Sequence, residues 1–503
     1  MIKNLPRHLH RHIPAFSGAF LLLLVAACGQ APQATVEQEA PQDSASKIPV
    51  TTDSDAAREA FLIGRDLNER LRATDAHEHF LKAVELDPSF AWAHLLAGFT
   101  GSTAQEFWDH LESAVEATGT ASDGERLLVL AAEAGAKGHP DEQIALLTQL
   151  VAAFPSDERA HNALGAVHFG RQEYGQAIEH YRHAIDINPE FSQPYNQKGY
   201  AHRFLADFEA AEASFQKYVE LIPDDPNPYD SYAELLMKMG RFEEAIGKYE
   251  QALEQNPNFV ASYVGIANNQ ILMGDPQAAR ATLEELSSVA RNVGESRAAL
   301  LWKARSYLHE GKYDEALETC GARLALAEAD DDQATIAGDL NLVGDILLEA
   351  GRLDEATDSY AKSIEAIEKA AVSDDVKENV KRNILFDQAR VALAGDDLQK
   401  AKETATSYGE MVEVKKIPFE VRQAHELMAM IALAEGKPDG ALAHLEQANQ
   451  QNPRVLLLTA QAHQGLGRGE DARAYCEAAA DFNALSGTYA FVRPAAQEML
   501  AGM

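Results

Sequence analysis

Small and large apolar residues return along most of this chain with a period of 34 residues. One series of small residues consists of Gly165, Gly199, Ala233 and Ala267. Alanines keep the same spacing at Ala177, Ala211, Ala245 and Ala279, and large residues do so at Tyr181, Phe215, Tyr249 and Leu283. A fixed period of this length indicates an array of repeats, in which each unit buries its apolar face against its neighbours.

The pattern resembles the tetratricopeptide repeat, which has a small residue at position 8, alanine at 20, a large residue at 24 and proline at 32. Here Pro189, Pro223 and Pro257 close three successive units. We place unit starts near residues 57, 91, 124, 158, 192, 226, 260, 297, 337, 382, 422 and 453. Position 20 is alanine except at His110 and Gln143, and the spacing departs from 34 after residue 293. The resemblance implies an all-α, right-handed superhelical solenoid of about twelve helix-turn-helix units over residues 56–485.

The residue types at these positions have a physical cause. Glycine or alanine at positions 8 and 20 lets two antiparallel helices cross closely, and the large residue at 24 fills the space beside the crossing. Glycine between the helices suits a left-handed helix end, which we expect at Gly240, Gly274, Gly311, Gly351, Gly436 and Gly467. Cys320 and Cys476 both fall at position 24, so we interpret them as buried core residues. Residues 486–503 are predicted to form a capping helix, with Pro494 in its first turn or kinking it.

The N-terminus is typical of a targeting segment. Residues 1–27 have a positive start (Lys3, Arg7, Arg11) and a short apolar run from Phe20 to Ala27, too short to span a bilayer. The run ends in Val-Ala-Ala-Cys28, which resembles a bacterial lipobox, whose cysteine is lipidated. An ordinary secretory signal is the alternative. Residues 28–55 are rich in Pro, Gln, Ser and acids, which predicts a disordered lipidated tether.

Charge and motifs narrow the function. The chain has 44 Lys and Arg against 78 Asp and Glu, a net charge of -34, which argues against a nucleic-acid partner. Nothing in the sequence predicts a metal site, a cofactor, a small-molecule substrate or a catalytic set. We therefore expect no enzyme.

The resemblance also implies an inner groove lined by the first helix of each unit. Mapping the groove positions onto the central units gives Asn162, Asn196, Tyr200, Arg203, Asn227, Asp230, Glu234 and Asn268. Asn162, Asn196 and Asp230 occupy position 5 of successive units, and their side chains could hold the backbone of an extended peptide. Groove solvation, or helix capping at Asn227 before Pro228, is the alternative. Tyr195, Tyr229 and Tyr263 recur at position 4, where we expect packing between helices rather than ligand binding.

Together these features predict a protein-interaction scaffold or adaptor, held by lipid in a bacterial envelope, in the outer membrane facing the periplasm. Its partners are expected to be basic or neutral proteins or peptides, because the chain is acidic. Two alternatives remain: a structural solenoid that associates with itself, and an enzyme with an unrecognised site between repeats.

Overall fold

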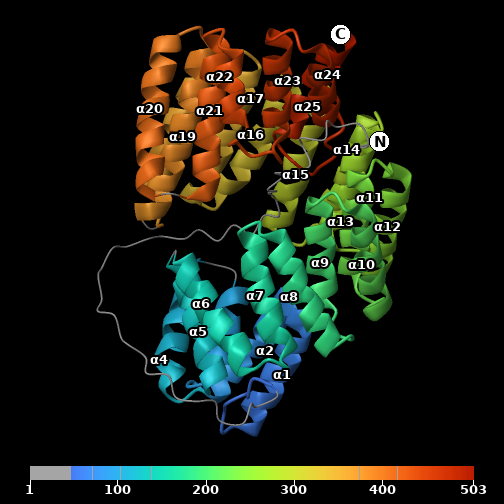
Figure 1. The fold of residues 1–503 in the computed structure, drawn as a ribbon, viewed down its shortest axis with the longest axis vertical. Helices are drawn as coiled ribbons and strands as arrows, with labels where there is room; N and C mark the ends of the chain where they lie inside the picture. The colour runs from blue at the N-terminus through green and yellow to red at the C-terminus, as the bar shows by residue number, and fades with distance from the viewer. Residues whose placement is uncertain (1–46, 71, 102–103, 138, 373, 416) are drawn as a thin grey trace. The chain divides into compact units, whose positions relative to one another are not determined.

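The computed structural model describes residues 47–503 apart from residues 71, 102–103, 138, 373 and 416. Throughout this part of the chain the regular structure is helical, with α1–α25 and one short 3₁₀ turn at Ala117–Gly119 (Figure 1). The predicted signal segment, Cys28 and most of the predicted tether lie outside the described residues. The all-α fold class is confirmed, as twelve successive helix pairs with α25 after them.

The described chain divides into two compact units, residues 47–231 and 232–503, with the boundary inside helix α11. We call them the N-terminal unit and the C-terminal unit. The helices of the N-terminal unit are α1 Asp55–Glu69, α2 Ala73–Leu86, α3 Ala91–Thr100, α4 Ala104–Glu116, α5 Asp123–Ala136, α6 Pro140–Ala153, α7 Glu158–Gly170, α8 Tyr174–Ile187, α9 Gln193–Phe204 and α10 Phe208–Leu221. Helix α11, Pro226–Lys238, begins in this unit and ends in the next.

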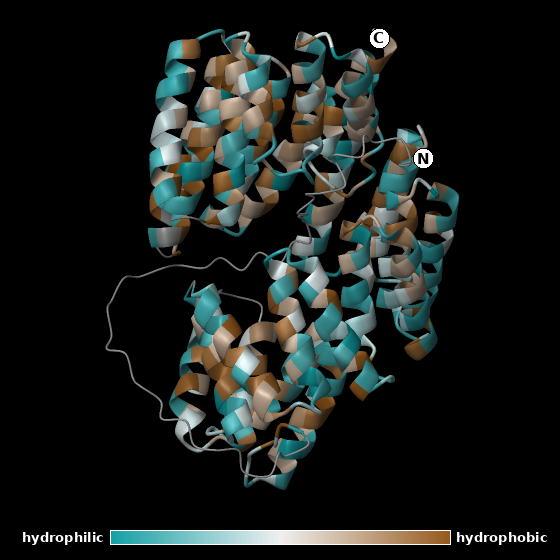
Figure 2. Cartoon of the chain, in the orientation of Figure 1, coloured by the Kyte–Doolittle hydropathy of each residue, from teal (hydrophilic) through white to brown (hydrophobic). Residues whose placement is uncertain are grey.

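The C-terminal unit continues the array of helix pairs. Its helices are α12 Phe242–Gln255, α13 Val260–Leu272, α14 Pro276–Val289, α15 Val293–Leu308, α16 Tyr313–Ala329, α17 Gln333–Glu349, α18 Leu353–Lys369, α19 Asp374–Ala394, α20 Leu398–Lys415, α21 Pro418–Ala434, α22 Pro438–Leu445, α23 Pro453–Gly465, α24 Gly469–Ala480 and α25 Tyr489–Ala501. Figure 2 shows hydrophobic and hydrophilic residues mixed along the same helices, as expected where each helix buries one side.

The crossing of the two helices in each pair follows the predicted packing. The alanines at position 20 in the four most regular repeats are fully buried, as are Tyr181, Phe215 and Tyr249 at position 24. At position 8, a Cβ added to Gly165 would lie 2.7 Å from the ring of Tyr181. Cys320 and Cys476 are free and buried, which confirms that they fill the core. Burial raises the pKa of the Cys320 thiol to about 11.

The turns between paired helices also agree with the sequence. All six glycines predicted there have a positive φ, between 70° and 88°. Three turns without glycine adopt the same left-handed conformation, at Gln172, Ala206 and Asp396. The backbone path of the repeat therefore imposes this conformation even where the residue type does not favour it.

One pair of glycines on α17 separates the effect of close packing from that of helix propensity. A Cβ on Gly344 would lie 2.5 Å from Cε1 of the Tyr360 ring, whereas a Cβ on Gly338 would meet no atom within 4 Å. We expect Gly344→Ala to destabilise the C-terminal unit by about 1–3 kcal/mol through overpacking. Gly338→Ala should stabilise it by about 0.5–1 kcal/mol, because alanine is the better helix former. Thermal and urea unfolding of both variants measures the difference, and equal effects would contradict the packing argument.

Residues 482–501 leave the last helix pair and return to an earlier part of the C-terminal unit. Helix α25 packs on α23 and α24, and also on α15. Ala490 belongs to the same apolar cluster as Ala304 and Leu308 of α15. Pro494 lies in the second turn of α25, inside the helix. The segment thus contacts the last helix pair. It also contacts a helix pair that lies nearly 200 residues earlier in the sequence.

Candidate functional site

The residues predicted to line the groove lie on the first helices of consecutive pairs: Asn162 on α7, Asn196, Tyr200 and Arg203 on α9, Asn227, Asp230 and Glu234 on α11, and Asn268 on α13. We call the side of each unit that these first helices form its first-helix surface. Six of the eight belong to the N-terminal unit, and Glu234 and Asn268 belong to the C-terminal unit. Their role in binding stays a prediction.

Asn162 and Asn196 have the same unusual environment in neighbouring repeats. They are 8% and 6% exposed, and the Oδ1 atom of each is buried without a hydrogen-bond donor. Asn162 Nδ2 donates to Gln193 Oε1 at 2.9 Å. A buried amide oxygen without a partner costs about 1–3 kcal/mol, so each of these two oxygens is an unsatisfied acceptor on its helix.

Next to these asparagines, α9 carries an aromatic and cationic pair. The Arg203 guanidinium lies 4.8 Å from the centroid of the Tyr200 ring. The ring centroids of Tyr200 and Phe215 are 5.1 Å apart, and the two rings pack edge to face. The two contacts hold the Tyr200 ring between a charged and an apolar neighbour. Tyr200 is thus fixed in place on α9, one turn after Asn196.

Helix α11 uses its own asparagine internally. The helix begins at Pro226, two residues before the start predicted from Asn227 and Pro228, and Asp225 Oδ1 accepts the backbone N–H of Asn227. The Asn227 side chain accepts hydrogen bonds from the hydroxyls of Tyr218 and Ser231, each at 3.3 Å. Capping therefore falls to Asp225, and the Oδ1 of Asn227 is already engaged within the fold.

The tyrosines at position 4 behave as packing residues. The hydroxyls of Tyr195, Tyr229 and Tyr263 donate to the carbonyl oxygens of Pro189, Pro223 and Pro257 at 3.0–3.2 Å. His94 and His161 occupy the same position in other repeats, and their Nε2 atoms contact the carbonyl oxygens of Pro88 and Pro155. Each bond joins the start of a repeat to the proline that ends the one before. Sequence reasoning missed the histidines because they share no residue type with the tyrosines.

Part of the first-helix surface of the C-terminal unit is covered by residues 482–496. Lys238 Nζ on α11 donates to the carbonyl oxygen of Phe482 at 2.5 Å and lies 3.7 Å from its ring centroid. Arg493 donates to the carbonyl oxygen of Leu272 at 2.8 Å. Asn268, 2% exposed, lies beneath this region and donates to Met237 Sδ at 3.2 Å. Residues 482–496 therefore contact α11, α13 and α15 on their first-helix side.

Farther along the C-terminal unit, the first helices are joined by a buried ionic cluster. Its members are Asp345 and Glu349 on α17, Asp387 and Arg390 on α19, Glu426 on α21 and Arg454 on α23. Arg390 contacts three carboxylates, at 3.1 Å, 3.0 Å and 2.7 Å. Burial and the neighbouring Asp345 raise the pKa of Asp387 to about 7, and burial raises the pKa of Glu426. Four carboxylates pair with two guanidiniums here, so these charged groups neutralise one another and link the four first helices.

An extended segment of the chain binds to the N-terminal unit through its backbone. Residues 47–52, which we call the strap, precede α1. Asp157 Oδ2 accepts the N–H of Ile48 and Glu125 Oε1 accepts the N–H of Thr51, both at 2.8 Å. The Ile48 side chain is 5% exposed and belongs to the core of the unit. The last part of the predicted tether is thus bound to the folded unit, because acidic side chains accept hydrogen bonds from its backbone N–H groups.

Neither a cluster of metal-ligating side chains nor a membrane-spanning helix occurs among the described residues. None of their His, Cys, Asp and Glu side chains gather in threes in a way that could hold a metal ion. No helix in the described ranges is both long enough and apolar enough to cross a bilayer.

Comparison with known protein families identifies repeats in four stretches of the chain. Family models described as tetratricopeptide repeat match residues 158–191, 192–225, 236–301 and 432–489. These stretches are tetratricopeptide repeats. None of the curated proteins matches the chain.

Solved structures of tetratricopeptide repeat proteins resemble parts of the chain. A tetratricopeptide repeat protein from Parabacteroides merdae is 14% identical, with a TM-score of 0.34, over 54% of this chain and 94% of that one. MamA is 19% identical, with a TM-score of 0.29, over 32% and 93%. YrrB, described as having an unusual peptide-binding site, is 14% identical, with a TM-score of 0.27, over 36% and 91%.

Proposed function

We propose that this chain is a lipid-anchored protein of the bacterial envelope that binds extended peptide or protein segments on the first-helix surface of its N-terminal unit. Tetratricopeptide repeats support an interaction scaffold in general. The observation that carries the choice of surface is the pair of buried, unpartnered Oδ1 atoms on Asn162 and Asn196. Backbone N–H groups of an extended segment would satisfy both oxygens without reading much sequence.

The strap supports this mode of binding within the same unit. It is an extended segment whose backbone N–H groups donate to Asp157 and Glu125, so side-chain oxygens of the repeats already hold one peptide backbone. The C-terminal unit is a weaker choice, since residues 482–496 cover its first-helix surface at α11, α13 and α15, and charged residues bridge its later first helices. The acidic balance of the chain favours neutral or basic segments as partners.

The binding surface can be tested by pull-down from detergent-solubilised envelopes. Asn162→Ala together with Asn196→Ala should weaken capture of the partner about tenfold or more, because two hydrogen bonds are lost. Gln176→Ala, an exposed amide on the second helix α8, is the matched control and should leave capture unchanged. Equal capture by all three proteins would overturn the proposed surface.

The anchor has a separate test. Cys28→Ala should release the protein from the membrane fraction into the periplasm, because a lipobox cysteine is the attachment point of the acyl chains. Mass spectrometry of the N-terminal peptide reports the acyl groups directly. A Cys28→Ala protein that stays in the membrane fraction would contradict the anchor.

A further inference from the structure

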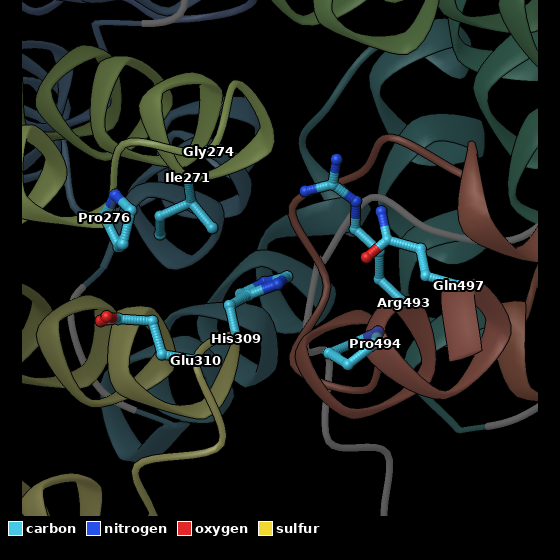
Figure 3. A pocket seen from close by; sticks show the side chains of 8 residues that line it. All are labelled: Ile271, Gly274, Pro276, His309, Glu310, Arg493, Pro494 and Gln497. Carbon is cyan, nitrogen blue, oxygen red and sulfur yellow. The ribbon is translucent and has the colours of Figure 1, made fainter. Parts of the chain in front are cut away.

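A cavity of about 390 Å³ lies in the C-terminal unit where α25 meets the α13–α14 turn and the end of α15 (Figure 3). It is lined by Ile271, Gly274, Pro276, His309, Glu310, Arg493, Pro494 and Gln497. Figure 3 shows His309 and Arg493 on opposite sides of this space, coming from α15 and α25. Its volume lies in the range of small-ligand sites, and its wall combines apolar side chains with a few polar groups.

Two arginines at this place have no acidic partner. Arg305 lies one turn before His309 on α15, with its guanidinium 4.3 Å from the Trp302 ring. Arg493 donates one hydrogen bond, to the backbone of Leu272. The Nε atoms of both arginines are buried without an acceptor, and neither guanidinium forms an ion pair with a carboxylate among the described residues. A buried N–H donor without an acceptor is costly, so each Nε atom would gain from an acceptor that the described residues do not supply.

The composition of the chain makes these two arginines unusual. Acids outnumber Lys and Arg by 78 to 44, so carboxylates are abundant. The one acid that lines the cavity, Glu310, is already held by Arg280 at 2.5 Å and Lys312 at 2.7 Å. The cavity is therefore a positive site in an acidic protein.

The electrostatics of His309 report the same positive field. Burial, together with the charges of Arg493 and Arg305, lowers the pKa of its imidazole to about 4. The ring is thus neutral at pH 7 and can donate or accept a hydrogen bond inside the cavity. Burial also lowers the pKa of Arg305 to about 10, which leaves it charged at neutral pH.

We propose that this cavity binds a small carboxylate, with the carboxyl group between Arg493 and His309 and the apolar part against Ile271, Pro276 and Pro494. Arg305 does not line the cavity, and its charge acts on the site from behind His309. Guanidinium groups pair with carboxylates through strong, directional hydrogen bonds. Two single positive charges and apolar walls suit a monoanion with a hydrocarbon body better than a phosphate. The carboxyl group belongs either to a free organic acid or to the C-terminus of a peptide.

Calorimetric titration of the full chain in detergent tests the proposal. The probes are butyrate, a short apolar peptide with a free C-terminus, the same peptide with a C-terminal amide, and inorganic phosphate. We expect butyrate or the free-acid peptide to bind and the amide not to bind. Binding of butyrate identifies a free acid as sufficient, whereas binding of the free-acid peptide alone identifies a peptide end. Binding of phosphate alone, or of no probe, would overturn the proposal.

Three variants locate the bound anion. Arg493→Gln should weaken binding about tenfold, since it removes a charge-assisted hydrogen bond. Arg493→Lys keeps the charge and should bind between the two, which separates loss of charge from loss of folding. Arg291→Gln, whose exposed guanidinium pairs with Glu295 at the start of α15, is the matched control and should bind normally. Equal affinity in the Arg493→Gln and control proteins would contradict the site.

His309 supplies a readout that structural disturbance would not mimic. A carboxylate bound beside the ring should raise the His309 pKa from about 4, because it offsets the two arginine charges. An NMR titration of the histidine ring protons with and without the bound probe measures the shift. An unchanged pKa under saturating probe would place the anion elsewhere.

Discussion

Tyr489→Ala is expected to lower the free energy of unfolding of the C-terminal unit by about 3–5 kcal/mol, the usual cost of removing a buried aromatic ring. The side chain is 0% exposed. Its ring lies 6.0 Å from that of Phe482 and 6.1 Å from that of His309, measured between centroids. Its hydroxyl donates to the carbonyl oxygen of Ala480. The substitution should therefore release residues 482–496 from α15.

Hydrogen–deuterium exchange followed by mass spectrometry is the appropriate measurement, because the two units need not unfold together. Exchange should rise in α25 and in α13 and α15 beneath it, and stay unchanged in α1–α10. Tyr489→Phe is the matched control, and it should cost only about 1 kcal/mol because it removes the hydroxyl alone. Equal protection of α15 in the wild-type and Tyr489→Ala proteins would contradict the role of the segment as a cover.

Glu420→Ala is expected to destabilise the C-terminal unit by about 3–5 kcal/mol, because it leaves a buried guanidinium without its carboxylate. Arg382 on α19 and Glu420 on α21 have side chains that are each 3% exposed. Arg382 Nη2 lies 2.7 Å from Oε1 and Nε lies 3.1 Å from Oε2, a two-point contact. Urea unfolding of the variant measures the loss.

An exposed ion pair provides the contrast. Glu355 on α18 pairs with Arg352, the residue before that helix, and both side chains are exposed to solvent. Glu355→Ala should change the unfolding free energy by less than about 1 kcal/mol. The double replacement Arg382→Met with Glu420→Leu should recover much of the stability lost in Glu420→Ala, because no unpaired charge is then buried. A Glu420→Ala effect as small as that of Glu355→Ala would contradict the assignment of a buried pair.

The regular part of the fold could be predicted from spacing alone. Glycine or alanine at position 8 and a ring at position 24 determine each other locally, as Gly344 and Tyr360 show, so a 34-residue pattern is sufficient to identify them. The six turn glycines follow from the same local logic. The left-handed conformation of residues such as Ala206 could not be predicted, because the backbone path of the repeat overrides the conformational preference of the residue there.

The candidate site was predicted only in outline. The repeat pattern placed Asn162 and Asn196 on first helices. It could not show that their side-chain oxygens lack hydrogen-bond donors, because that depends on which donors the neighbouring helices provide. The return of residues 482–501 to α15 was not predicted, because it depends on how the packing of the intervening helices directs the chain rather than on local sequence. The cavity between Arg493 and His309 could not be predicted either, because its two sides lie far apart in the sequence.

In-cell photo-crosslinking can test whether the first-helix surface of the N-terminal unit binds a partner. A photoreactive phenylalanine derivative is placed at Tyr200 on α9 and, in a separate protein, at Gln176 on α8. We expect a reproducible crosslinked protein from position 200, none from position 176, and loss of the crosslink when Asn162 and Asn196 are replaced by alanine. Equal crosslinking from both positions, or a crosslink that survives the double replacement, would contradict it.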